Sequence, residues 1–183
     1  RNAFYVLDRE ALTTAEDMTM ERIPNVSGEL LLYGKQTDRS ARLELVVAKG
    51  AGYDEDRHYL QELCGEFVSG DPTEQAIAET SSLEDVMTWN WHLPKDVTRE
   101  QHAKFLNQKR VEVLKNGWSN LKFKPLDDKT PRDVAADPAY RIPLQALLLL
   151  LEQSPDGQTT SQSAISELRK DLGVAAPAKI EPS

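Results

Sequence analysis

The sequence predicts an α+β protein, with a β-hairpin-plus-helix part over residues 1–80 and a mainly helical part over residues 81–183. Two β-type apolar runs, an amphipathic pattern over residues 54–68 and a leucine-rich run over residues 144–151 carry this prediction. With 39% hydrophobic and 28% charged residues, the composition is ordinary for a soluble globular protein.

The clearest strands are predicted at Glu29–Tyr33 and Ala41–Ala48, which are separated by polar residues 35–40. This spacing is typical of a β-hairpin with a long loop. Two strands alone are marginal in water, so the hairpin needs a third strand at Phe4–Leu7 or a helix across its buried face.

A helix is predicted after Asp54, because apolar pairs recur every four residues. The pairs are Tyr59 with Leu60, Leu63 with Cys64, and Phe67 with Val68, and Gly70 is the expected stop. We interpret Cys64 as a small core residue. Shorter helices are expected through Ala11–Ala15 and through Thr73–Ile77.

Trp89 and Trp91 stand two residues apart before Pro94, in a segment that the pattern predicts to be extended. Paired tryptophans pack between subdomains or form a platform for a partner, so both are candidate partner contacts. Beyond them, Thr98 and Gln101 form a capping box that opens a helix to Asn116, with Gly117 as its stop.

Thr130, Pro131 and Asp133 predict a short helix that begins at Pro131. Asp137 and Pro138 predict the start of the next one, and Pro143 either kinks that helix or marks its true start. The five leucines 147–151 point all round a helix, so we expect this helix to be covered on most sides. A last short helix is expected at Ala164–Leu172, with Gly173 as its stop.

One stretch contains Trp118, Pro125-Leu126, Lys129 to Arg132 and Val134 to Ala136, followed by the leucine-rich run. It resembles a segment W…P-L-x-x-K-T-P-R-x-A-A…L-L of many uncharacterised bacterial proteins. The same segment is similar to the end of the toxin-binding domain of antitoxins of the ParS, MbcA and Xre class. This resemblance implies a protein partner, and it makes Lys129 and Arg132 candidate contacts.

No catalytic, cofactor or metal site is predicted. His58, His92 and His102 do not stand at metal-ligand spacing, and Asp54, Asp56 and His58 lack the rest of a calcium loop. The sequence contains no phosphate-binding glycine loop, nucleophile elbow or HExxH motif. The single Cys64 excludes a disulfide framework and a multi-cysteine zinc site.

The charge pattern argues against nucleic-acid binding, because the net charge is −8. Residues 1–94 carry 8 basic and 18 acidic side chains, whereas residues 95–132 carry 10 basic and 5 acidic side chains. No membrane span or signal peptide is visible, and the leucine run is too short for a span, so we expect a cytoplasmic protein.

These observations favour a binding or assembly module that meets a protein partner or other domains of a longer chain, with an oligomeric state that the sequence does not fix. An antitoxin-like toxin-binding protein is the first alternative. A small hydrolase whose site is assembled from tertiary structure is the second, and enzymatic activity is the less favoured reading.

Overall fold

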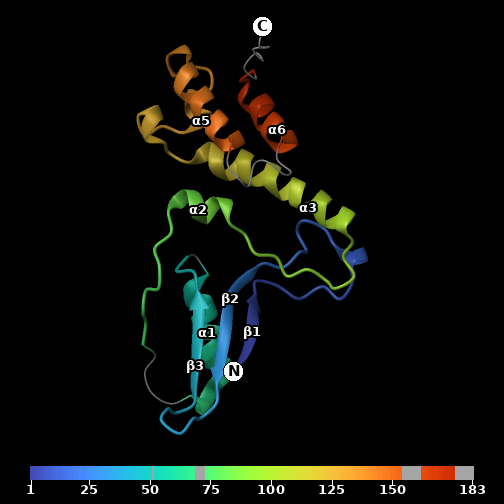
Figure 1. Ribbon diagram of the computed structural model, residues 1–183, viewed down its shortest axis with the longest axis vertical. Coiled ribbons are helices and arrows are strands. Elements are labelled where there is room, and N and C mark those ends of the chain that lie inside the picture. The colour runs from blue at the N-terminus through green and yellow to red at the C-terminus, as the bar shows by residue number, and fades with distance from the viewer. Residues whose placement is uncertain (51, 69–72, 154–161, 176–183) are drawn as a thin grey trace. The chain divides into compact units, whose positions relative to one another are not determined.

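The computed structural model describes residues 1–50, 52–68, 73–153 and 162–175, and in it the chain divides into two compact units (Figure 1). Unit 1 consists of residues 1–79 and 89–97, and unit 2 consists of residues 80–88 and 98–183. An antiparallel sheet occurs in unit 1, and the elements of unit 2 are helical. The predicted α+β class is therefore confirmed.

Unit 1 is built on a three-stranded antiparallel sheet of β1 (Asn2–Leu7), β2 (Val26–Tyr33) and β3 (Arg42–Val47), in the order β1-β2-β3. The predicted hairpin and its third strand are both confirmed. The register aligns Leu30 with Phe4 on one side and with Leu45 on the other. Because side chains alternate along a strand, these three share one face, which is therefore apolar at the middle of all three strands.

The helix α1 (Tyr53–Cys64) follows the sheet in sequence and runs behind β2 and β3 in the view of Figure 1. Of its apolar residues, Leu60 is buried and Cys64 is half-buried. The helix ends at Gly65, with φ 48° and ψ −130°, a conformation that side-chain-bearing residues rarely adopt. The predicted stop was therefore too late, and Gly70 itself lies outside the described residues.

The helix predicted through Ala11–Ala15 does not form. A single 3₁₀ turn, Ala15–Asp17, takes its place, with Thr14 as its N-cap. Threonines at 13 and 14 favour caps and turns over a helix interior, which explains the difference. Residues 73–79 also lack a helix, so the prediction through Ile77 was wrong.

Unit 2 contains five α-helices among its described residues: α2 (Ser82–Met87), α3 (Arg99–Glu112), α4 (Pro131–Val134), α5 (Arg141–Gln153) and α6 (Gln162–Leu172). The capping box at Thr98 and the start of α4 after Thr130 are confirmed. One hydrophobic core joins the helices, and its buried members are Leu114, Trp118, Leu126, Val134, Leu144, Leu148, Ala164, Ile165, Leu168 and Leu172.

The helical conformation that begins after Thr98 does not end at Gly117 as predicted. After α3 it continues through a π-helical turn, Val113–Gly117, into a 3₁₀ turn at Trp118–Asn120. Gly117 has a negative φ of −102°, so it is not a left-handed cap. What requires glycine is space, because a Cβ at this position would lie 2.4 Å from Val86 Cγ1 of α2.

In the leucine-rich helix α5, Leu148 is buried, and Leu147, Leu149 and Leu151 are half-buried. Leu144 and Leu148 are 1% and 0% exposed, but Ile142 and Leu150 are 81% and 65% exposed. The predicted cover on most sides is therefore confirmed for four of the five leucines, and Leu150 is the exception. Pro143 is the third residue of α5, within the first turn, where its missing N–H breaks no helical hydrogen bond. At the end of α6, Gly173 has φ 67°, so the predicted stop is confirmed.

Candidate functional site

The tryptophan segment belongs to unit 1, where its backbone pairs antiparallel with the residues at the start of β2. Asn90 O accepts a hydrogen bond from Val26 N at 2.7 Å, and His92 N donates to Pro24 O at 2.9 Å. The rings of Trp89 and Trp91 are half-buried, with centroids 6.3 Å apart and planes tilted by 53°. They pack against one another, and their role as partner contacts stays a prediction.

Lys129 lies in a tight turn of unit 2 and is fixed by Tyr140. Its Nζ donates to the Tyr140 hydroxyl at 2.9 Å and lies 4.5 Å from the centre of that ring. The hydroxyl in turn donates to Asp127 Oδ2 at 2.8 Å. The hydrogen bond with Tyr140 raises the pKa of Lys129. Asp127 and Asp128 both have left-handed φ values, 54° and 57°, which shape this turn.

Arg132 ties three elements of unit 2 together. Its Nη2 donates to Lys115 O at 2.7 Å, to Ser119 Oγ at 3.2 Å and to Asp171 Oδ2 at 2.9 Å. The carbonyl belongs to the π-helical turn and the carboxylate to α6. Each member of the Lys129–Arg132 motif therefore has a role inside unit 2, and contact with a partner stays a prediction for Lys129 and Arg132.

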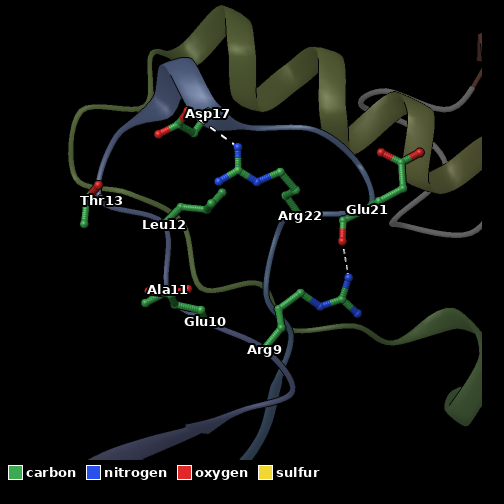
Figure 2. Close-up of a pocket in the computed structure, with 8 residues that line it drawn as sticks. All are labelled: Arg9, Glu10, Ala11, Leu12, Thr13, Asp17, Glu21 and Arg22. Carbon is green, nitrogen blue, oxygen red and sulfur yellow. Dashed lines mark hydrogen bonds and ion pairs between the residues drawn. The ribbon is translucent and has the colours of Figure 1, made fainter.

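A pocket of about 300 Å³ lies in the loop between β1 and β2 (Figure 2). Figure 2 shows the Arg22 guanidinium beside Leu12, with Asp17 Oδ1 3.5 Å from Nη1, and the Arg9 side chain directed at the backbone carbonyl of Glu21. Arg9 is also held by both oxygens of Asp8, whose hydrogen bonds raise the pKa of the guanidinium.

The pocket contains no nucleophile paired with a base. Besides the two arginines, its lining residues are Glu10, Ala11, Leu12, Thr13, Asp17 and Glu21. His58 and His92 do not line it, and the described residues contain no group of three or more histidine, cysteine, aspartate or glutamate side chains that could hold a metal ion. The hydrolase alternative therefore gains no support from this pocket.

Several exposed apolar side chains of unit 1 lie on α1 and the turn after it. Tyr59 and Leu63 are 57% and 62% exposed, and Phe67 and Val68 of the following turn are 91% and 50% exposed. We call these four residues the Tyr59–Val68 surface. Tyr59 and Leu63 stand one helical turn apart and therefore adjoin on α1. The apolar residues that recur every four positions in the sequence include these four, but we predicted that they would be buried in the core.

Carboxylates flank the Tyr59–Val68 surface. Glu55 and Glu62 are exposed on α1, and Glu66 is exposed in the next turn. Glu62 Oε1 lies 3.4 Å from His58 Nε2. The one arginine of α1, Arg57, forms an ion pair with Glu74, with Nη1 2.9 Å from Oε1. The exposed border of the apolar residues is therefore predominantly acidic.

Within the described part of the chain, no helix has the length and apolar character needed to cross a membrane. Comparison with known proteins finds no matching family model, no matching curated protein and no matching solved structure. The resemblance to antitoxin toxin-binding domains consequently stays a prediction. The proposed function therefore rests on the residues of this chain alone.

Proposed function

We propose that this chain is a protein-binding module and that the Tyr59–Val68 surface on α1 is its main contact. The observation that carries the proposal is the exposure of four large apolar side chains within ten residues of sequence, led by Phe67 at 91%. Single apolar side chains on a surface are normal, but adjoining ones, as Tyr59 and Leu63 are, are typical of interaction sites.

Burial of this surface would supply the free energy that a specific contact needs. Burying one large apolar side chain contributes about 1.5–3 kcal/mol. Aromatic residues such as Tyr59 and Phe67 are also the residues that most often dominate protein interfaces, since they bury much area with few rotatable bonds. The surface therefore has the composition of an interface centre.

The other candidate contacts and the pocket of Figure 2 have fewer features of a partner site. The pocket of Figure 2 contains arginines paired with carboxylates and a backbone carbonyl, with no nucleophile paired with a base. Lys129 and Arg132 are engaged inside unit 2. The Tyr59–Val68 surface, by contrast, makes up much of the apolar exposure of unit 1.

A photo-crosslinking amino acid placed at Leu63 or Phe67 tests the proposal in cells of the source organism. We expect it to capture a protein that the same label at Ile142 does not capture, although Ile142 is 81% exposed. The captured protein is then purified, and its Kd is measured with the intact chain. Leu63→Ser combined with Phe67→Ser should weaken binding at least about tenfold, because truncating an interface anchor costs more than 1 kcal/mol.

Ile142→Ser is the matched control, and it should leave the Kd unchanged. Both variants alter exposed side chains, so their urea midpoints should stay close to that of the parent. An unchanged Kd in the Leu63 and Phe67 variant would show that the contact lies elsewhere, and the proposal would then be wrong.

A further inference from the structure

We infer that the partner of the Tyr59–Val68 surface is a basic amphipathic helix, with apolar side chains on one face and lysines or arginines beside them. The inference rests on the proposed function and specifies the chemistry of the partner. It follows from the arrangement of charge around the apolar residues.

The acidic border lies next to the apolar line on α1. At 100° per residue, Glu55 and Glu62 lie 20° apart around the helix axis, and Tyr59 and Leu63 lie 40° apart. Glu62 immediately precedes Leu63, and Glu55 lies one turn before Tyr59, so the two lines are neighbours on the same side of the helix. Any partner that covers Tyr59 and Leu63 therefore meets both carboxylates.

A carboxylate beside an apolar contact loses part of its hydration when the contact forms. That loss is unfavourable unless a cation of the partner approaches the carboxylate. Apolar anchors flanked by lysine or arginine satisfy both requirements at once. An amphipathic helix presents side chains in such a pattern, with anchors every three or four residues.

A second copy of this chain fits the surface poorly. A two-fold dimer brings the same patch of both copies together, so Glu55, Glu62 and Glu66 of one copy would face those of the other. The whole chain also carries a net charge of −8. An anionic membrane is disfavoured for the same electrostatic reason.

Three designed amphipathic peptides with the same leucine face and with lysine, glutamine or glutamate on the polar face test the inference. Fluorescence anisotropy measures their Kd for the intact chain at low and moderate salt. We expect the lysine peptide to bind at least about tenfold more tightly than the glutamine peptide, the glutamate peptide to bind least, and the lysine preference to shrink as salt rises.

The variant Glu55→Lys with Glu62→Lys should lose the preference for the lysine peptide. The control variant Glu79→Lys with Glu100→Lys makes the same change in net charge at exposed positions outside α1, and it should retain most of the preference. A preference that survives the first variant, or that disappears equally in both, would overturn the inference because long-range charge would then explain it.

The remaining outcomes separate the inference from the proposed function. If all three peptides bind equally and Leu63→Ser abolishes binding, the surface is a contact but its partner need not be basic, so the inference alone fails. If peptides bind and neither Leu63→Ser nor Phe67→Ser weakens them, both statements fail. Failure of every peptide to bind, or a dimer in sedimentation that Leu63→Ser dissociates, overturns the basic-helix assignment.

Discussion

Gly117 and Val86 approach so closely that a Cβ on residue 117 would stand 2.4 Å from Val86 Cγ1. Substitution Gly117→Ala should therefore destabilise unit 2 by about 1–3 kcal/mol, the usual range for overpacking. The gain in helix propensity, up to about 1 kcal/mol, opposes this effect but is smaller, and a valine side chain has few rotamers with which to yield. Urea denaturation measures the change.

The added substitution Val86→Ala should recover part of that loss, because it removes the group that clashes. Gly34→Ala is the control, since a Cβ at that position would meet nothing within 4 Å. If Gly117→Ala proves neutral, the helix that contains Val86 yields more easily than the contact suggests.

Leu148 and Leu150 form a matched pair on α5, with 0% and 65% exposure. Leu148→Ala should cost about 2–5 kcal/mol, because it leaves a cavity in the core of unit 2. Leu150→Ala should change the stability by about 0.5 kcal/mol or less, as is usual for an exposed position. Equal shifts in the urea midpoint would show that Leu150 is covered in solution.

Thr130 caps α4, with its Oγ1 accepting from Asp133 N at 3.1 Å. Thr130→Ala should lower the stability by about 1 kcal/mol through the lost cap, and Thr130→Ser, which keeps the hydroxyl, should retain most of it. Calorimetric melting of the two variants makes the comparison. A similar loss in both would mean that the threonine methyl group, and not the cap, supports this turn.

Asp8 should make unfolding pH-dependent in acid. Burial raises its pKa, but hydrogen bonds from the side chains of Arg9 and Asn25 and from the backbone of Asn25 outweigh burial, so the folded pKa is lowered. A lowered folded pKa means that the stabilisation is present above the unfolded pKa of about 3.9 and is lost as pH falls through the folded value.

The variant Asp8→Asn should therefore be less stable than the parent at pH 7, and the difference should narrow as pH falls below about 4. Urea titrations between neutral and acid pH provide the measurement. Asp38→Asn is a suitable control, because Asp38 is exposed with only a 3.9 Å ion pair. A difference that stays constant across this pH range would contradict the role given to the Asp8 carboxylate.

Duplex DNA should bind weakly and nonspecifically at physiological salt. Two of the lysines in the predicted basic region are engaged internally: Lys109 Nζ lies 3.1 Å from Glu112, and Lys115 Nζ lies 3.6 Å from Glu167. Nucleic-acid affinity depends on several free cations that neutralise phosphates together. Anisotropy with a labelled random duplex at two salt concentrations tests this, and submicromolar binding with a steep salt dependence would contradict it.

Local sequence rules predicted the features that depend on a few neighbouring residues. The caps at Thr98 and Thr130 and the stop at Gly173 follow from side-chain hydrogen bonds and backbone conformation within one turn. The burial of Leu148 was predicted from the leucine run, but the exposure of Leu150 could not be, since the side of α5 that stays open depends on how the other helices of unit 2 pack against it.

At the candidate site, too, the sequence pattern predicted which residues are apolar but not which of them are exposed. The recurrence over residues 59–68 predicted an apolar line, and Leu60 beside it is indeed buried. Whether Tyr59 and Leu63 also contact the rest of unit 1 depends on how far the sheet extends beneath α1, and periodicity carries no information on that. An apolar pattern that a small sheet cannot cover in full is thus available for contact with another molecule.

The backbone bonds of Asn90 and His92 with Val26 and Pro24 have a consequence for biosynthesis. Residues 89–97 of unit 1 are translated after residues 80–88, which belong to unit 2. The backbone at Asn25 therefore stays unpaired with this segment until Trp91 has left the ribosome. A gene truncated after the codon for Thr80 would encode β1, β2 and β3 but would leave the Val26 amide and the Pro24 carbonyl without these partners.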